Sequence, residues 1–434
     1  MLSALGYHRS VLAVVRRVDE RAWTALHGGP EESLDDVLLR NAYRLEADVH
    51  PDVFRAGERA ARALELAEGV DYYQVSGEPN ASYLHQAGKA VILFQGALLD
   101  RLDEDELTAV IGHELAHRSL WQAEDGAYLA VDRLLDAAAG DARTPSQYLE
   151  THRRWSLATE LFADRGALTA CGDLRTAIRA LLKLETGLST ADPDAYLRQA
   201  ESLDLRSGSR GTSHPEAVGR AWALKNWLAG EDVEALVTGP LDVDAPDLLD
   251  AVLLRELSRD FAAAIAQTEG LRTDTIATAA AGFADPLDAP GLAHEGSGGE
   301  TAGFAGRLDL AGGEAEGAAR RLDLAGGEAV GAARRVDLAG GGVRFDEPLG
   351  VRPVDGAPQP RPRPLAAATV RYLCYLLLDL ATADPDVGDA GLVASLVVAR
   401  RSGLGGYVDV ADDELGWSDK ERVRLVQAAA EVVG

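Results

Sequence analysis

The sequence has few cysteines and no long hydrophobic run. It contains only Cys171 and Cys374, too few for a disulfide framework, so we expect reduced thiols in a cytoplasmic protein. A membrane-spanning helix needs roughly 20 consecutive apolar residues, and no stretch approaches that length. Arg9, Arg16 and Arg17 interrupt the short apolar run near the N-terminus, which is not the pattern of a secretion signal. We therefore expect a soluble protein with no membrane span.

Positive charge is also scarce. The 434 residues include 43 Lys and Arg against 70 Asp and Glu, which gives a formal net charge of −27. This charge argues against nucleic acid as a partner and should repel anionic membrane surfaces. The abundance of arginine, alanine and glycine fits a GC-rich genome, while the acidity also fits a high-salt habitat, and composition leaves both readings open.

The spacing of apolar residues predicts an α+β fold. It is helical up to about residue 68, including "LDDVLLRNAYRLEADV", and again from Asp103 to about residue 270. Between these regions, "VDYYQVSG", "ASYLHQ" and "AVILFQG" are short and rich in β-branched and aromatic residues, with turn residues between them. We therefore expect residues 1–270 to form a mainly helical domain with a small β-sheet.

A repetitive tract separates this domain from the C-terminal part of the chain. "RLDLAGGEAEGAAR" at 307–320 is followed by "RLDLAGGEAVGAAR" at 321–334, and a proline-rich stretch comes later. A solenoid is one interpretation of such repeats, but paired glycines and few large apolar residues favour a linker over 271–364. Residues 365–434 read as a small all-helical C-terminal module. We expect limited proteolysis to cut first within the linker.

The stretch "HELAH" holds the strongest chemical pattern. On a helix capped by Asp103, His113 and His117 are four residues apart and share one face, which suits a tetrahedral zinc ion. Glu114 lies beside them and has the chemistry of a general base that later acts as an acid. The competing interpretation is an ordinary helix that happens to have three polar residues.

A second helix supplies a candidate third ligand. In "WSLATELFADRGALTACG", Glu160 and Asp164 are four residues apart among apolar neighbours. Glu160 could bind the metal while Asp164 accepts the outer N–H of a ligand histidine. The alternative is that both are solvated surface carboxylates.

The ordered set "PNASYL", "HELAH", "ELFAD" and "SHPEAVGR" resembles metallopeptidase family forty-eight, the HtpX-like and type 1 CAAX prenyl protease group of gluzincins. The resemblance covers roughly residues 35–230 and implies a zincin-type domain with one zinc ion per chain. It also implies that Asn80 and Ala81 lie along a bound peptide and that His214 and Arg220 stabilise the oxyanion. On its own, His214 would be interpreted as a loop histidine that caps a helix before Pro215, but the order and spacing of the four motifs favour a place in the site. Many members have membrane spans, and this sequence has none.

These patterns together predict a zinc metalloendopeptidase acting on a peptide or protein. Two alternatives stay open: a non-catalytic zinc-stabilised scaffold that binds peptides or proteins, and a peptidase dedicated to one partner. The C-terminal module faintly resembles a TerB-like helical module and could recruit a protein partner. In such a module Asp384, Asp386 and Asp389 could hold a cation, although an ordinary acidic interhelical loop is the favoured interpretation.

Overall fold

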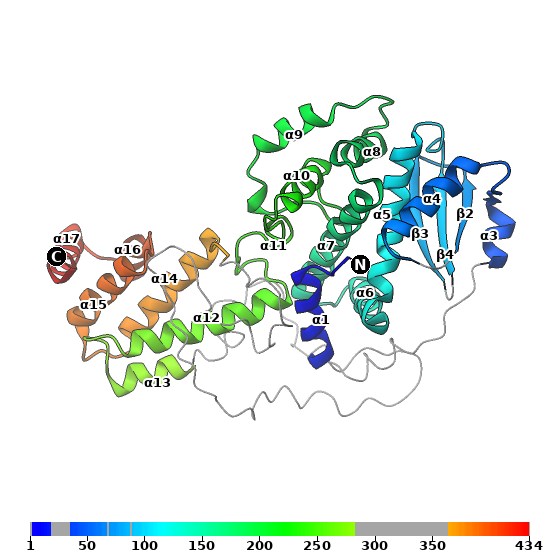
Figure 1. The fold of residues 1–434 in the computed structure, drawn as a ribbon. Helices are drawn as coiled ribbons and strands as arrows, with labels where there is room; N and C mark the ends of the chain where they lie inside the picture. The colour runs from blue at the N-terminus through cyan, green and yellow to red at the C-terminus, as the bar shows by residue number, and fades with distance from the viewer. Residues whose placement is uncertain (1, 19–34, 67–68, 87–88, 283–362, 434) are drawn as a thin grey trace, which may run out of the picture. The chain divides into compact units, whose positions relative to one another are not determined.

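The computed structural model describes residues 2–18, 35–66, 69–86, 89–282 and 363–433. They fall into two compact units (Figure 1). Unit 1 comprises Met1–Asp141 and Leu149–Gly239, and unit 2 comprises Ala142–Tyr148 and Pro240–Gly434. The described residues are mainly helical with one small sheet, which confirms the predicted α+β class. None of the helices in these ranges is both long and apolar enough to cross a lipid bilayer.

Unit 1 holds the sheet and the helices around it. Its elements are α1 (Gly6–Val18), α3 (Asp35–Asn41), β1 (Tyr43–Arg44), α4 (Pro51–Ala63), β2 (Val70–Val75), β3 (Asn80–Gln86), β4 (Lys89–Gln95), α5 (Glu104–Gln122), α6 (Ala127–Ala139), most of α7 (Ser146–Cys171), α8 (Leu174–Thr186), α9 (Pro193–Glu201), α10 (Ala217–Leu228) and α11 (Ala235–Thr238). The three strands expected between residues 69 and 95 are present as β2, β3 and β4.

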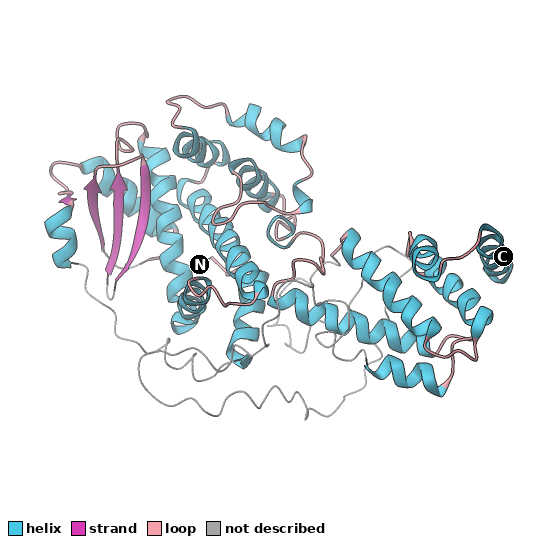
Figure 2. Ribbon diagram, turned by 180° about the vertical axis from the view of Figure 1, so that it is seen from behind, coloured by secondary structure: helices cyan, strands magenta, loops and turns pink. Residues whose placement is uncertain are grey.

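The sheet has the strand order β1-β2-β4-β3, and its three long strands are visible side by side in Figure 2. β4 runs parallel to β2 and antiparallel to β3, which leaves β3 at an edge. Buried residues of β2, β3 and β4 share one core with α4 and α5. On the opposite face, Leu38 of α3 packs against Tyr73 and Val91.

The short strand β1 was not expected. The sequence predicts one helix over "LDDVLLRNAYRLEADV", but α3 ends at Asn41 and the next residues pair with the sheet. Tyr43 lies opposite Gln74 and Arg44 opposite Tyr73 in an antiparallel ladder. Pairing with an open sheet edge satisfies backbone groups that a longer helix would satisfy internally. The local helical spacing is therefore overridden by a long-range contact.

The start of α5 is fixed by a capping box, as the sequence predicts. The Asp103 carboxylate accepts the N–H of Glu106 at 2.8 Å, and the Glu106 carboxylate accepts the N–H of Asp103 at 2.9 Å. Glu106 is fully buried and also binds Lys183 Nζ at 2.7 Å and Arg179 Nε at 2.9 Å. These bonds anchor the first turn of α5 to α8.

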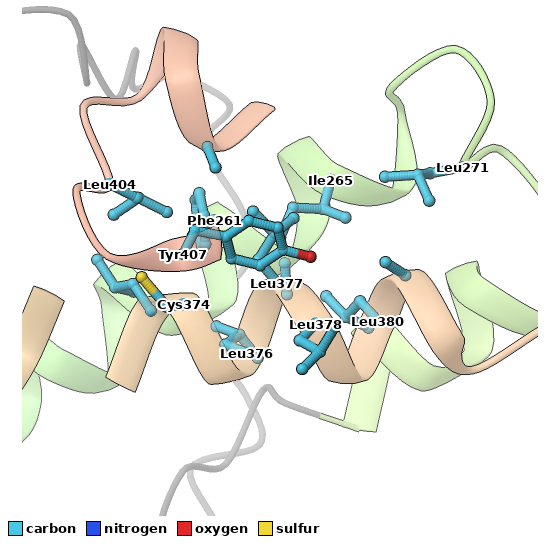
Figure 3. Close-up of a cluster of buried hydrophobic side chains, with 14 of the residues drawn as sticks. Phe261, Ile265, Leu271, Cys374, Leu376, Leu377, Leu378, Leu380, Leu404 and Tyr407 are labelled. Carbon is cyan, nitrogen blue, oxygen red and sulfur yellow. The ribbon is translucent and has the colours of Figure 1, made fainter. Parts of the chain in front are cut away.

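Unit 2 is a separate helical bundle with its own apolar core. Its helices are α12 (Leu248–Ala266), α13 (Asp274–Gly282), α14 (Ala367–Thr382), α15 (Gly388–Arg401), α16 (Tyr407–Leu415) and α17 (Asp419–Val433). Figure 3 shows part of this core, where Phe261 and Ile265 of α12 lie among Leu377 of α14 and Tyr407 of α16. Two helices before the repetitive tract therefore share one core with the helices after it.

The sequence predicts that the first domain ends at residue 270, but the structure places the boundary earlier, between Gly239 and Pro240. Leu254, Leu257, Phe261 and Ile265 give α12 a buried stripe that faces the C-terminal helices. The backbone is joined as well, because Leu241 N–H donates to Pro364 O at 2.8 Å and Ala366 N–H donates to Leu241 O at 2.9 Å. Helical spacing shows that α12 has an apolar face but not which partner covers it. Of the predicted linker, 271–282 includes α13, and 283–362, with all the repeats, lies outside the described residues.

The acidic residues of the C-terminal module make contacts within unit 2. Hydroxyl groups of Thr273 and Thr275 hydrogen-bond to Asp384, which also accepts the N–H of Asp386 at 3.0 Å. Asp389 pairs with Arg424 at 2.6 Å. These contacts favour an ordinary interhelical loop over a cation site.

The shared core leads to a prediction about limited proteolysis. A cut within residues 283–362 should leave two fragments that co-elute from a size-exclusion column in native buffer, because α12 and α13 remain packed against α14–α17. The fragments should separate in denaturant. Separation in native buffer would contradict the shared core and favour a C-terminal module that begins at Leu365.

Candidate active site

Two helices bring together the three side chains proposed as metal ligands. His113 and His117 lie on α5, and Glu160 lies on α7. The two histidine Nε2 atoms are 3.3 Å apart, and they lie 3.5 and 3.7 Å from the Glu160 carboxylate oxygens. Taken together, the three donor atoms lie within 4.8 Å of one another. Two imidazole nitrogens and one carboxylate oxygen converging in this way fit a zinc ion with one open position.

Small residues let α5 and α7 approach closely enough for this convergence. A Cβ built on Gly112 would lie 2.3 Å from Ala170 Cβ, and one built on Gly166 would lie 2.3 Å from Ala116 Cβ and 2.8 Å from Gly112 O. Each helix therefore presents glycine and alanine four residues apart at the crossing. The histidines follow these small residues directly in the sequence. The crossing thus sets the spacing between the ligands of α5 and Glu160.

Asp164 and Arg220 lie behind the candidate ligands. Asp164 Oδ1 is 3.2 Å from His113 Nδ1, the nitrogen that faces away from Glu160. Arg220 of α10 donates to both Asp164 oxygens, at 2.8 and 2.6 Å. Burial tends to raise the pKa of Asp164, but the charge and hydrogen bonds of Arg220 together with His113 hold it below its usual value. The Asp164 carboxylate is therefore an ionised partner for His113.

The family resemblance implies that Arg220 stabilises the oxyanion, but its guanidinium already pairs with carboxylates of the protein. It is 6% exposed, and its third nitrogen lies 3.4 Å from Glu185 while Nη2 is also 3.4 Å from Glu160. Its guanidinium is thus surrounded by three carboxylates. Glu185 was not predicted, because nothing in its local sequence distinguishes it from other glutamates on helix surfaces.

Glu114 faces the edge strand of the sheet. Its side chain is buried, with 7% exposed, and Oε2 accepts the backbone N–H of Tyr83 in β3 at 2.7 Å. Burial raises the pKa of Glu114, a change that the charge of His113 and the Tyr83 N–H oppose only in part. The Tyr83 contact was not predicted, since a backbone donor leaves no trace in the sequence. It leaves Oε1 as the carboxylate oxygen available to a second partner.

The other predicted site residues lie on β3 and on the loop before α10. Asn80 and Ala81 begin β3, where the Asn80 side chain accepts the Ala81 N–H at 2.9 Å. The side chain of His214 is 57% exposed, and its Nε2 lies 3.6 Å from Glu160 Oε1. His214 Nδ1 is 2.9 Å from Ser213 Oγ. The structure therefore places His214 beside the candidate ligands.

The environment of the site shifts the pKa values of His113 and His117 in opposite directions, and this predicts how metal binding depends on pH. Burial acts to lower the pKa of His113, but hydrogen bonds and negative charge from Asp164 and Glu160 outweigh it and raise the pKa to about 10. Burial, with the charge of His113, lowers the pKa of His117 to about 4. Near neutral pH, His113 is then protonated and His117 is neutral, so a binding metal ion must displace one proton.

Zinc affinity should therefore rise by about tenfold for each pH unit between pH 6 and 8, since this range lies below the pKa of His113. Calorimetric titration in buffers of different ionisation enthalpy should report the release of one proton per zinc ion. Release of two protons, or an affinity independent of pH, would contradict this protonation pattern.

The part of the chain that holds the candidate ligands is similar to known metallopeptidases. The sequence of residues 47–228 matches the family model described as "Peptidase family M48", and this range includes every candidate ligand. The chain is also 31% identical, over 199 residues, to the plastoglobule-localized metallopeptidase 48, chloroplastic, of Arabidopsis thaliana. That match covers 41% of this chain and 57% of the plant protein, and no solved structure gives a significant match. Residues 47–228 thus match peptidase family M48, and this range holds the His113, His117 and Glu160 cluster.

Proposed function

We propose that this protein is a zinc-dependent endopeptidase of the gluzincin type. The observation that supports the proposal is the convergence of His113, His117 and Glu160 next to a buried carboxylate, Glu114, that is not one of the three. A zinc ion bound by the three residues would polarise a water molecule and the scissile carbonyl. A scaffold that used zinc only for stability would have no need of Glu114 at this place.

In the proposed reaction, Glu114 moves the proton. Its Oε2 is held by the Tyr83 N–H, so Oε1 would accept the proton of the attacking water and later deliver it to the leaving amine. Asp164, itself held by Arg220, would orient His113 through Nδ1. His214, exposed at the rim of the site, would donate to the developing oxyanion. Because Arg220 is bound by carboxylates, we assign it to positioning rather than to direct contact with the oxyanion.

The substrate should bind as an added strand on β3. "NASYL" and "AVILF" are the two segments that the sequence offers for this role, but β4, which contains "AVILF", has a strand on each side. β3 lies at an edge of the sheet and begins with Asn80 and Ala81, and its Tyr83 N–H holds Glu114. Main-chain pairing there would place an extended peptide across the carboxylate of Glu114.

A peptide-library digest tests this proposal. The wild-type protein should cut peptides internally in a zinc-dependent manner, and Glu114→Gln should not. Mass spectrometry of the products would give the preferred sequence around the cut. Peptide binding without cleavage by the zinc-loaded wild type would overturn the proposal and support the scaffold alternative, whereas a single efficient site would indicate a dedicated substrate. The cytoplasmic location stays a prediction, and the related plant protein is named chloroplastic.

A further inference from the structure

Arg153 of α7 donates hydrogen bonds to the backbone of the loop that precedes α10. Its Nη1 donates to Ser209 O at 3.2 Å and to Gly211 O at 2.9 Å. Its Nε and Nη2 donate to the two oxygens of Glu150, each at 2.7 Å. All three guanidinium nitrogens are thus engaged, in the planar fork geometry that lysine cannot reproduce. Arg153 and Glu160 are seven residues apart, so they lie on the same side of α7.

Hydrogen bonds between its own residues also stabilise the loop of residues 209–216. Glu216, at the start of α10, accepts Ser209 Oγ at 2.7 Å and the N–H of Arg210 at 2.9 Å. Gly211 N–H donates to Ser209 Oγ at 3.1 Å. A Cβ on Gly211 would lie only 1.9 Å from His214 O, so the turn closes too tightly for any other residue. Displacement of one end of this loop should therefore move the other end.

His214 depends on this loop for its position. Its side chain is 57% exposed, so little packing fixes the ring. The ring lies 2.9 Å from the hydroxyl of Ser213, its own neighbour in the chain, and 3.6 Å from Glu160. The loop backbone must therefore determine where the ring lies.

We propose that Arg153 is a positioning residue that holds the 209–216 loop against α7 and thereby fixes the His214 ring beside Glu160. The catalytic part of this inference rests on the proposed function, in which His214 stabilises the oxyanion. The structural part, that Arg153 holds the loop, does not depend on it.

Trypsin digestion of the zinc-loaded, full-length protein tests the structural part without using peptidase activity. Arg210 is exposed, but both flanking carbonyls are held by Arg153. Arg153→Ala should accelerate cleavage after Arg210 by about tenfold or more, because a protease needs a locally opened backbone. Cleavage after Arg206, outside the loop, is the internal reference, and Arg175→Ala, at an exposed arginine paired with Asp194, is the control variant.

Peptidase kinetics test the catalytic part. Arg153→Ala should lower kcat by about tenfold or more with little change in KM and about one zinc ion retained. In a His214→Ala background the same substitution should cause no further loss, since both changes remove one function. Gly211→Ala perturbs the same loop where Gly211 packs against His214 O, and it should give the same kcat loss and the same lack of additivity.

The outcomes separate this inference from the proposed function. Unchanged cleavage after Arg210 in Arg153→Ala, or additive losses with His214→Ala, would overturn the positioning role. If the zinc-loaded wild type does not turn over any peptide, the proposed function fails, and the tryptic rates still decide whether Arg153 holds the loop.

Discussion

Replacing Glu114 by glutamine should lower peptide turnover by about 10²- to 10⁴-fold while the protein keeps its metal. Glutamine has the same shape and can still accept the Tyr83 N–H that holds Glu114 at 2.7 Å. It cannot take a proton from water, so the substitution removes the proposed chemistry and leaves the geometry. Glu114 is not one of the three converging donors, and zinc content should stay close to one per chain.

Glu104→Gln is a suitable control for this experiment. Glu104 lies in the first turn of the same helix, where it pairs with Arg55 at 2.9 Å, far along α5 from the histidines. This variant should cleave at the wild-type rate. If Glu114→Gln also cleaves at the wild-type rate, either the activity belongs to a contaminant or Glu114 is not the general base.

The second large effect is expected at the crossing of α5 and α7. Gly166→Ala would place a methyl group 2.3 Å from Ala116 Cβ and 2.8 Å from Gly112 O, contacts that neither helix can relieve by rotating a side chain. Overpacking of this kind costs about 1–3 kcal/mol of stability. Because metal-ligand distances must hold to within about 0.2 Å, separation of the helices should also weaken zinc binding by about tenfold or more.

Gly140→Ala provides the matched control. Gly140 follows α6 with a helical φ of −74°, and a Cβ there would meet only ordinary contacts, the closest 3.5 Å from Ala137 O. Its unfolding midpoint and zinc affinity should stay near the wild-type values. Wild-type zinc affinity in Gly166→Ala would show that the spacing between α5 and α7 does not set the ligand geometry.

The parts of this site that could be predicted are those encoded by local spacing. His113 and His117 share a face because any helix places residues four apart together, and the Asp103 cap marks where that helix begins. Glu160 and Asp164 follow the same rule on α7. The close approach of α5 and α7 could also have been predicted from the sequence. Each helix has a glycine and an alanine four residues apart, Gly112 with Ala116 and Gly166 with Ala170.

The parts that could not be predicted depend on contacts between distant segments. The sequence gives no indication that the backbone of Tyr83 meets Glu114, or that Arg220 is enclosed by Asp164, Glu160 and Glu185. The predicted domain boundary at residue 270 differs from the structure for the same reason, because helices more than 100 residues later in the chain cover the apolar face of α12. Spacing along the chain shows which face is buried, but only the folded chain shows what covers it.

Elemental analysis of protein purified without added metal tests most directly the claim that His113, His117 and Glu160 form one zinc site. We expect about one zinc ion per chain in the wild type and in Glu114→Gln. The His113→Ala/His117→Ala double variant should contain essentially none while unit 2 stays folded, since its core is separate. A wild type without metal, or full zinc occupancy in the double variant, would contradict the claim.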